Sequence, residues 1–433
     1  MSLPQQRPPI ALGFIGCGVV GSGAIRTLQD NAASIARQVG APLVIRRVCV
    51  RDVARDRGLD LPRDVFTDDV ARVLDDPEIA IVCELMGGVA PAGEYVRRAL
   101  ANGKQVVTAN KELIAKEGRA LLTEASERGL DLAFEGSVAG GIPIIRALTA
   151  SLAADRIEAI MGIVNGTTNY ILTKMAAEGA GFDETLAEAQ AKGYAEADPT
   201  ADVDGHDAAS KLAILAGLAF HTPVEIDAVH REGIRGVTDR DIAYARELGF
   251  VIKLVALAKS HDGEMELRVH PLLLPEAHPL AGVNDVFNAV FVRGSSVGEV
   301  MFYGRGAGSL PTGSAVAADV MDVARNLAAG ATGRVRFAPG TPKRLVPMDD
   351  VRSRYFFRLM TADRPGMLAG IAGICGEHDV SLDAVIQKSS AGDVAELVLM
   401  THETREGDIR AALARIAALP TVPQIGAVIR VEG

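Results

Sequence analysis

The chain contains few aromatic residues and no tryptophan. Phe, Tyr and Trp together account for 4% of its 433 residues, yet hydrophobic residues still make up 48%. The core must therefore be built mainly from Ala, Val, Leu and Ile, which suits buried parallel strands covered by helices. A chain of this length is expected to form roughly two or three domains. These features favour an α/β architecture.

Cysteine is also scarce. The four cysteines, Cys17, Cys49, Cys83 and Cys375, lie far apart and show neither a CxxC motif nor the Cys/His spacing of a zinc site. We expect no disulfide and no structural zinc, and we interpret the four side chains as reduced, mostly buried thiols. A redox-sensing role for one of them is the less favoured alternative.

Blocks of positive charge and long apolar runs are absent as well. The net charge is −10 and no segment is rich in Lys and Arg, so neither nucleic acid nor an anionic membrane is an expected partner. The N-terminal residues MSLPQQRPPI lack the apolar core of a signal peptide, and apolar runs such as LAILAGLAF are too short to cross a bilayer. We expect a cytoplasmic protein that acts on a small molecule.

A glycine-rich turn follows the first apolar run. Residues 10–15 lead directly into the sequence GCGVVG, and a helical pattern continues to about residue 39. Glycines with GxGxxG spacing let a backbone turn tightly, approach a pyrophosphate and present it to the positive end of a helix. Further strands are expected at 43–50, 79–85 and 105–109, with a helix at 91–103. This alternation predicts a doubly wound parallel sheet of the Rossmann type that binds a dinucleotide, with a flexible glycine turn as the alternative. The residues expected to contact the cofactor here are Gly16, Gly18, Val19, Val20, Gly21 and Gly87.

The end of the second strand should decide which dinucleotide binds. An acidic residue there would hold the ribose hydroxyls of NAD, whereas an arginine would suit the 2′-phosphate of NADP. Arg51 occupies this place, Asp52 follows it, and Arg55 and Arg57 add positive charge nearby. We favour NADP and keep NAD open. A solvated charged turn is the alternative.

A carboxylate and a lysine lie one helical turn apart in the most informative segment. Asp207 and Lys211 share a face of a helix expected from about 206 to 220, which is apolar nearly all round and should be buried. Burial lowers the pKa of a lysine and a neighbouring carboxylate raises it, so such a pair can exchange a proton near neutral pH. Lys211 is our candidate acid for aldehyde reduction, Asp207 would orient it, and Glu196 could bind a substrate ammonium group. A modest exposed ion pair is the alternative.

Four parts are expected along the chain. They are a dinucleotide-binding domain at 1–135 with a return helix at 312–330, an α+β catalytic and dimerisation domain at 136–311, a linker at 331–349 and a C-terminal domain at 350–433. The C-terminal part has the order strand, helix, strand, strand, helix, strand, which is typical of a ferredoxin-like unit. Gly308, just before the return helix, could line the cofactor a second time or form a packing turn.

The segment from Ala189 to Lys211 resembles the signature of homoserine dehydrogenases. Its fixed positions are filled by Ala189, Gly193, Asp198, Pro199, Asp202, Gly205, Asp207 and Lys211. The likeness covers the whole chain. It includes VRD at 50–52, ELMGG at 84–88, VTANK at 107–111, EGSVAGGIP at 135–143, NGTTNYIL at 165–172 and GRGAGSLPTGSAV at 304–316.

This resemblance implies reversible hydride transfer between a nicotinamide dinucleotide and the pair aspartate semialdehyde/homoserine, in the biosynthesis of threonine, methionine and isoleucine. It implies that Lys211 is the proton donor, that Glu196 and Asp207 bind the substrate, and that Lys111 contacts cofactor and substrate. It also implies a structural monovalent cation, usually sodium, although a tight turn would explain the same glycines. The matching cation ligands are Glu135 and the backbone carbonyls of Val138, Gly140 and Ile142.

The C-terminal part resembles an ACT domain, with the turn from 361 to 368 matching its strand-to-helix turn. The resemblance implies an amino-acid effector, threonine in this family, held by Asp363, Gly366 and Leu368 in a homo-oligomer that is a dimer or tetramer. A mere oligomerisation module is the alternative.

Two other functions compete. An aspartate-semialdehyde dehydrogenase needs an acyl-accepting cysteine, and no cysteine lies between 136 and 335. A catalytically silent sensor of dinucleotide and amino acid predicts loss of Lys211 or Glu196, and both are present.

Overall fold

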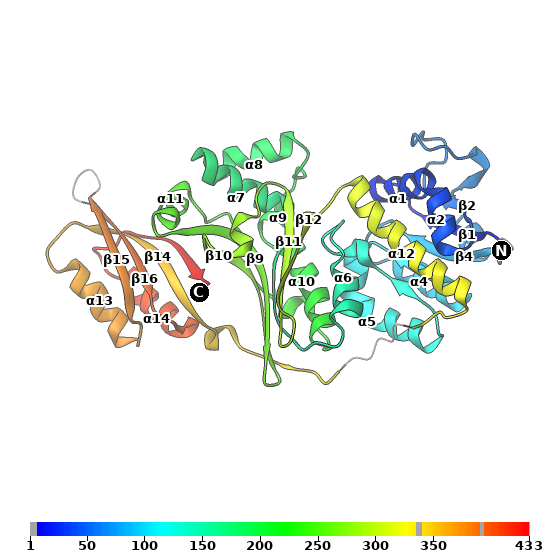
Figure 1. Ribbon diagram of the computed structural model, residues 1–433. Helices are drawn as coiled ribbons and strands as arrows, with labels where there is room; N and C mark the ends of the chain where they lie inside the picture. Colours follow the sequence, from blue (N-terminus) through cyan, green and yellow to red (C-terminus); the bar gives the residue numbers. More distant parts are fainter. Residues whose placement is uncertain (1–6, 335–339, 390–393, 433) are drawn as a thin grey trace. The chain divides into compact units, whose positions relative to one another are not determined.

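The computed structural model describes residues 7–334, 340–389 and 394–432. A parallel sheet of six strands holds the N-terminal part of the chain, in the order β3-β2-β1-β4-β5-β6 (Figure 1). This is the strand order of a doubly wound dinucleotide-binding fold, as the sequence predicts. The strands are β1 (Ile10–Ile15), β2 (Leu43–Cys49), β3 (Phe66–Thr67), β4 (Ile79–Glu84), β5 (Gln105–Thr108) and β6 (Leu132–Ala133).

Helices cover both faces of this sheet, and the side chains of β1 alternate between them. Leu12 and Phe14 join the hydrophobic core on one face, whereas Ile15 joins the core on the other. The single helix expected to run to residue 39 is interrupted at Asn31, which ends α1 and precedes α2. The helices are α1 (Val19–Asp30), α2 (Ala32–Val39), α3 (Ala71–Leu74), α4 (Ala92–Ala101) and α5 (Lys111–Glu127).

A long helix from far along the chain packs on α1. In α12 (Ser309–Ala329), Gly313 lies so close to α1 that an added Cβ would be 2.5 Å from the backbone nitrogen of Ala24. A Cβ on Gly23 would likewise come within 2.0 Å of the backbone oxygen of Ser309. Glycine at both positions therefore lets the two backbones touch.

The chain divides into two compact units. The first contains Met1–Ile157, Ser210–Ile226 and Asn288–Pro342, and the second contains Glu158–Ala209, Asp227–Phe287 and Lys343–Gly433. The predicted domain boundaries at 135, 311 and 349 stay a prediction, and the expected linker at 331–349 lies partly outside the described residues. The first unit also contains η1 (Arg63–Val65), η2 (Glu135–Ser137), α6 (Ile144–Arg146), the π-helical turn η3 (Ala147–Ser151) and β12 (Gly298–Arg305). Helix α10 (His206–Ala219) and strand β11 (Phe287–Gly294) have residues in both units.

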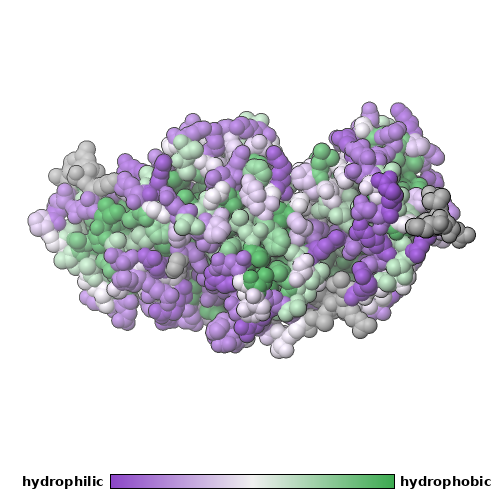
Figure 2. Space-filling model, in the orientation of Figure 1, coloured by the Kyte–Doolittle hydropathy of each residue, from purple (hydrophilic) through white to green (hydrophobic). Residues whose placement is uncertain are grey.

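The second unit contains a mixed sheet with the order β7-β9-β10-β18-β14-β16-β15. Its antiparallel hairpin of β9 and β10 turns at Asp262 and Gly263, which have φ values of 46° and 84°. The main strands are β7 (Ile157–Ile163), β9 (Phe250–His261), β10 (Glu264–Pro275), β14 (Arg352–Ala362), β15 (Leu382–Ser389), β16 (Val394–Thr401) and β18 (Gln424–Val431). Short strands are β8 (His230–Arg231), β13 (Arg344–Leu345) and β17 (Thr404–Arg405). The helices are α7 (Gly166–Glu178), α8 (Phe182–Ala191), α9 (Thr200–Val203) and α11 (Asp239–Glu247), and Figure 2 shows hydrophilic side chains over α8.

The C-terminal part has the predicted βαββαβ order. Its helices α13 (Met367–Glu377) and α14 (Glu406–Ala417) pack on one face of β14, β15, β16 and β18, around Tyr355, Phe357 and Leu359. The sequence did not predict that this sheet continues into the rest of the unit, where β18 pairs in parallel with β10. Among the described residues, no helix is both long and apolar enough to span a membrane.

Candidate active site

The glycine turn after β1 has the geometry that a dinucleotide site requires. Gly16 has a φ of 95°, and a Cβ there would be 2.7 Å from the backbone oxygen of Leu85. A Cβ on Gly21 would be 2.7 Å from the backbone oxygen of Gly16. Gly18, at the start of α1, faces open space, with nothing within 4 Å of an added Cβ. Two glycines thus permit close packing, and the third leaves room for a phosphate beside the helix N-terminus.

A buried carboxylate organises the neighbouring strand ends. Glu84, the last residue of β4, accepts hydrogen bonds from the Met86 backbone N–H at 2.9 Å and from Thr108 Oγ1 at 2.7 Å. Burial raises its pKa although these bonds favour the charged form. Asn110 Nδ2 donates to the Gly88 backbone oxygen at 2.6 Å, so the turn after β4 is tied to the end of β5. Glu84 was not predicted as a site residue, because its one signal in the sequence is a carboxylate at the end of an apolar strand.

Lys111 and Gly87 lie at this same end of the sheet. Gly87 has a φ of 80° and follows β4, whereas the half-buried Lys111 is the first residue of α5. Asn110 caps that helix, because its side chain accepts from the Leu113 backbone N–H at 3.1 Å. The carboxyl ends of β1, β4 and β5 therefore bring the glycine turn, Gly87 and Lys111 to the edge where doubly wound sheets bind ligands.

Arg51 is exposed in the loop after β2. The neighbouring Asp52 carboxylate accepts from the backbone N–H groups of Ala54 and Arg55 at 3.0 and 3.2 Å, so it stabilises its own turn. Arg57 lies over the ring of Phe66, 5.5 Å from its centroid, and donates to the Asp52 backbone oxygen. Arg51 is therefore exposed at the end of β2, and the carboxylate next to it in the sequence is used within its own turn.

The segment expected to hold a cation turns sharply. Ala139 and Gly140 have φ values of 54° and 53°. The Glu135 carboxylate accepts from the backbone N–H groups of Ile145 and Arg146, each at 2.8 Å, and burial raises its pKa. Its side chain is thus engaged at the start of α6. Backbone carbonyls of this segment are oxygen donors that suit a hard monovalent cation.

Ile142, another expected cation ligand, already accepts a backbone hydrogen bond through its carbonyl. Val138 and Ile142 are buried, and the Ile142 carbonyl accepts from the Ile144 backbone N–H at 2.8 Å. One of its two lone pairs therefore remains. Among the described residues, no group of three or more His, Cys, Asp or Glu side chains is arranged to hold a metal ion.

Gly308 precedes α12 with a φ of 119°, so its place before a helix N-terminus is as expected. Nearby, a Cβ on Gly140 would come within 2.5 Å of the Gly306 backbone oxygen. The Gly306–Gly308 loop and the turn at Gly140 are therefore in direct contact, which links the second candidate cofactor loop to the candidate cation segment.

In the second unit, Asn165 joins two carboxylates of the signature segment. Its Nδ2 donates to Asp202 Oδ1 at 2.7 Å and to Asp207 Oδ2 at 2.9 Å. Its Oδ1 accepts from the backbone N–H of Thr168, which fixes the orientation of the amide. Asp207 is 7% exposed. Asn165 lies within the NGTTNYIL motif, but its role was not predicted because it lies 42 residues before Asp207.

Lys211 differs from its expectation in one respect. It lies one turn after Asp207 on α10, as predicted, but it is half-buried rather than buried. Most of the apolar residues after it are buried, so the helix has the expected character although the lysine itself is only half-buried. Glu196 is exposed in the loop between α8 and α9, where its backbone oxygen accepts from Gln190 Nε2 at 3.0 Å. Lys211 belongs to the first unit, and Glu196 and Asp207 belong to the second.

The candidate effector residues lie at the start of α13. Gly366 has a φ of 89° and precedes the helix, and Leu368 is 38% exposed. Asp363 lies in the turn that joins β14 to α13. The turn therefore has the shape of the strand-to-helix turn that the sequence predicts.

The four cysteines are free thiols. Three are buried and Cys49 is half-buried, and burial raises the pKa of all four. A raised pKa disfavours the thiolate, so these residues are poor candidates for redox sensing.

The parallel sheet, its glycine turn and the adjoining α+β elements define a dinucleotide-dependent oxidoreductase. The family model "Homoserine dehydrogenase, NAD binding domain" matches residues 16–135, "Homoserine dehydrogenase" matches 143–321, and "ACT domain" matches 356–421. The chain belongs to the homoserine dehydrogenase family, whose members are NAD(P)-dependent oxidoreductases acting on a CH–OH group.

Relatives match the chain over nearly its whole length. The homoserine dehydrogenase of Bacillus subtilis is 44% identical over 426 residues, which is 98% of each chain. The crystal structure of a homoserine dehydrogenase from Thiobacillus denitrificans is 45% identical, with a TM-score of 0.93 over 99% of each chain. A hyperthermophilic archaeal homoserine dehydrogenase in complex with NADPH is 28% identical, with a TM-score of 0.62 over 73% of this chain and 97% of its own.

Proposed function

We propose that this enzyme reversibly reduces L-aspartate 4-semialdehyde to L-homoserine, with Lys211 as the proton donor. The observation that supports this most is the Asp207 carboxylate, which is buried and held by Asn165 at the start of α10. Lys211 follows one turn later on the same helix. A fixed carboxylate beside an ammonium group is suited to hold a substrate hydroxyl and exchange its proton.

The nicotinamide, when bound, supplies or accepts the hydride at the carbonyl carbon. Lys211 donates a proton to the carbonyl oxygen as that oxygen gains negative charge, so one hydride and one proton convert the aldehyde to the alcohol. Asp207 orients the Lys211 ammonium group and accepts from the substrate hydroxyl. Glu196 binds the substrate ammonium group, and Lys111 stabilises negative charge near both ligands. In the reverse direction, Lys211 removes the proton from the homoserine hydroxyl.

We propose NADP as the preferred cofactor and keep NAD as the alternative. Arg51 offers a cation at the place where a 2′-phosphate would lie, and Asp52 is engaged in its own turn. The archaeal relative, described in complex with NADPH, supports this choice by likeness. The glycine turn would hold the pyrophosphate through Gly16, Gly18, Val19, Val20 and Gly21. Gly87 and Gly308 would contact the rest of the dinucleotide.

We further propose a structural sodium ion held by backbone carbonyls of Glu135, Val138, Gly140 and Ile142. The turn at Ala139 and Gly140 supports it, because two successive positive φ values reorient neighbouring carbonyls. The Glu135 carboxylate is engaged with α6, so this residue would contribute its carbonyl oxygen.

Regulation by an amino acid is proposed for the C-terminal domain. The match to the ACT family supports an amino-acid effector, and threonine, as the end product of the pathway, is the proposed one. Asp363, Gly366 and Leu368 would contact it, in a homodimer or homotetramer that works in the cytoplasm. An oligomerisation module without effector binding is the alternative.

Parallel assays of homoserine oxidation with NADP and with NAD, with and without threonine, test the proposal. We expect turnover with both cofactors, a higher kcat/KM with NADP, and inhibition by threonine. The Lys211→Ala variant should bind the dinucleotide normally, while its kcat falls roughly 100-fold or more. Dinucleotide and homoserine binding without turnover in the unmodified enzyme would instead favour the silent sensor. Near-normal turnover of Lys211→Ala would rule out this residue as the acid.

A further inference from the structure

The last strand of the chain carries an arginine that is almost fully buried. Arg430 lies on β18 opposite Leu272 of β10, and it is 4% exposed. Its guanidinium makes a bidentate pair with Glu232, in which Nη1 donates to Oε2 and Nη2 to Oε1, each at 2.9 Å. Two more hydrogen bonds, at 2.8 and 2.7 Å, join it to Glu406 of α14. A bidentate arginine fixes the position of its carboxylate partner in two directions.

Glu232 is held by other groups as well. His230 Nε2 lies 2.8 Å from Oε1 of Glu232. The backbone N–H of Glu232 donates to the Val269 backbone oxygen at 2.8 Å. Burial opposes ionisation of Glu232, but hydrogen bonds from His230 and Arg430 outweigh it and keep its pKa well below the ordinary value. The two carboxylates likewise raise the pKa of Arg430 against the effect of its burial. The pair is therefore ionic across the usual pH range.

The residues after Glu232 press on the segment that leads into α10. A Cβ on Gly233 would lie 2.3 Å from the backbone oxygen of Val203 and 2.7 Å from the Cα of Asp204, so the two backbones are in direct contact. The backbone N–H of Ile234 donates to that same Val203 oxygen at 2.9 Å. The position of residues 203 and 204 therefore depends on where the chain after Glu232 lies.

A second contact continues this connection to the signature segment. Arg235 Nε donates to Asp204 Oδ1 at 2.7 Å. Asp204 is followed by Gly205, which has a φ of 81°, and α10 begins at the next residue. Asp207, held by Asn165, is in the first turn of that helix.

We propose that Glu232 and Arg430 are positioning residues for the catalytic segment. Their pair ties β18 of the C-terminal domain to Val203 and Asp204, and it thereby fixes the start of α10 and the Asp207 carboxylate. The proposal rests on the proposed function in one respect, because it takes Asp207 to act in the reaction. The C-terminal domain is then part of the scaffold of the active site, in addition to any role in effector binding.

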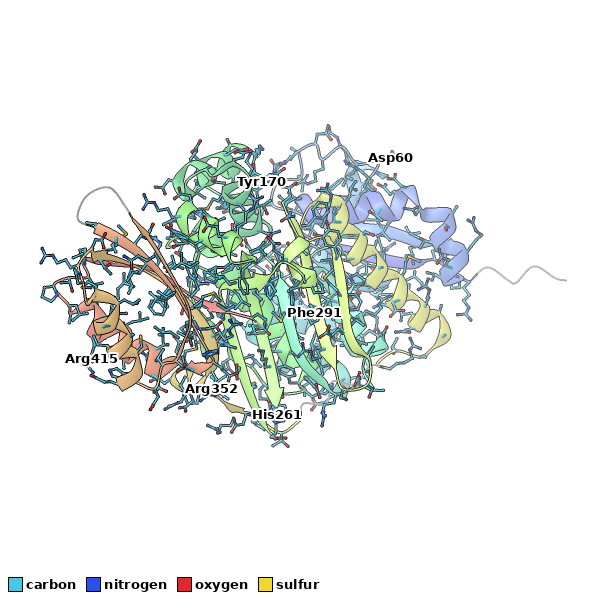
Figure 3. All side chains as sticks on the ribbon, turned by 60° about the vertical axis from the view of Figure 1, so that its left-hand side comes forward. Asp60, Tyr170, His261, Phe291, Arg352 and Arg415 are labelled. Atoms are coloured by element: carbon cyan, nitrogen blue, oxygen red, sulfur yellow. The ribbon has the colours of Figure 1, made fainter. Side chains whose placement is uncertain are left out.

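The variants Arg430→Gln, Glu232→Gln and Gly233→Ala test this tie at three points. Gly233→Ala leaves the ion pair in place but forces a Cβ against Val203, so it tests the tie without removing a buried charge. Arg352→Gln is the control, because Arg352 pairs with Glu403 at 2.9 Å in the same C-terminal domain with both side chains more than half exposed (Figure 3 labels Arg352).

We expect each test variant to lower kcat for homoserine oxidation by roughly 10- to 100-fold, because a displacement of about 1 Å suffices for such a loss. In the test variants, the KM for the dinucleotide should stay within about twofold of the wild-type value. The kcat of the control Arg352→Gln should also stay within about twofold of the wild-type value. Arg430→Lys keeps the charge without the bidentate geometry, so its kcat should fall between those of the wild type and Arg430→Gln. Deuterium exchange of the backbone at 200–209 should rise in the test variants and not in the control.

The exchange measurement separates this inference from the proposed reaction, because it needs no substrate. If the wild type oxidises no homoserine but Arg430→Gln still increases exchange at 200–209, the proposed function fails and the tie stands. If folded Arg430→Gln and Gly233→Ala show normal kcat and unchanged exchange at 200–209, the tie is overturned. Increased exchange confined to 352–432 with normal kcat would also overturn it, since the pair would then only dock the C-terminal domain.

Discussion

Under the proposed preference for NADP, the exposed side chain of Arg51 should decide cofactor choice. The Arg51→Asp variant should raise the KM for NADPH roughly tenfold or more, because a charge-assisted contact to a 2′-phosphate is replaced by repulsion. The KM for NADH should change much less. Steady-state kinetics with both cofactors measure the ratio, and Arg37→Asp on the exposed side of α2 is the control for net charge. A larger effect on NADH than on NADPH would contradict the proposed preference for NADP.

Asn165 has two functions that substitution can separate. Its Oδ1 caps α7, and its Nδ2 joins Asp202 and Asp207. Asn165→Ala should lose both functions, with a cost in stability of about 1 kcal/mol for the missing cap. Asn165→Ser should recover most of that stability, because serine is also a good N-cap, but it should not recover kcat. Thermal unfolding and homoserine oxidation distinguish the two effects. Recovery of kcat by serine would mean that the amide bridge does not position Asp207.

At the scale of elements, α12 contributes a buried acidic group to the first unit. Asp319 of α12 is buried and accepts from the Glu135 backbone N–H at 2.8 Å. Burial, with repulsion from Glu135, raises its pKa from 3.8 to about 7. The folded state therefore holds this proton more tightly than the unfolded state, and stability falls as the pH rises from about 4 to about 7.

Asp319→Asn should remove this pH-dependent loss, because an amide keeps an acceptor for the Glu135 N–H without the charge. It also gives up the 3.4 Å ion pair with Arg146, which affects stability at both pH values. Between pH 5 and pH 8, the unfolding free energy of the wild type should fall by roughly 1–3 kcal/mol more than that of the variant. Denaturant unfolding at both values measures it. The matched control is Asp322→Asn, one turn further along α12 with its side chain 41% exposed. If the unfolding free energies of the wild type and Asp319→Asn depend equally on pH, ionisation of Asp319 costs the folded state little free energy.

Local patterns predict some of these elements and not others. Strands β1 and β4 are largely buried on both faces, so each is a nearly continuous apolar run that the sequence reveals. Strand β3 has two residues, too few to form a pattern, and the break at Asn31 is hidden because the apolar periodicity resumes at once in α2. The glycine turn was predicted in detail because its chemistry is local.

Pairings between distant residues could not be read from the sequence. The Asn165–Asp207 bridge spans 42 residues, and the Glu232–Arg430 pair spans 198. Neither partner has a local signal that selects the other. For the same reason, the sequence predicted the C-terminal domain but not the pairing of β18 with β10. The half-buried state of Lys211 also depends on its surroundings in space, which helical periodicity does not specify.

At the scale of the whole molecule, a buried cluster of charges joins the C-terminal domain to α11 within the second unit. Arg358 of β14 donates to Asp241 Oδ1 at 2.7 Å and to Glu396 Oε1 at 2.9 Å. Tyr244 OH donates to the same Glu396 at 2.5 Å. Asp241 and Glu396 are 0% and 6% exposed. Because removal of one partner leaves a buried charge, such a cluster should make the two parts unfold together.

Arg358→Met keeps an unbranched side chain similar to the aliphatic part of arginine but removes the charged guanidinium. Within the described part of the chain, Asp241 then keeps the hydrogen bonds from Thr238 at its helix cap but has lost its cation. We therefore expect a loss of roughly 3–5 kcal/mol in the unfolding free energy. Arg410→Gln breaks an exposed pair with Asp349 in the same domain and should cost less than about 1 kcal/mol. Urea unfolding followed by circular dichroism and by tyrosine fluorescence measures both variants. Coincident transitions in the wild type that separate in Arg358→Met would show that the cluster couples the C-terminal domain to α11. A loss for Arg358→Met no larger than that of the control would contradict the role assigned to the cluster. The pairing of β18 with β10 and the Arg430–Glu232 pair would then have to carry the coupling.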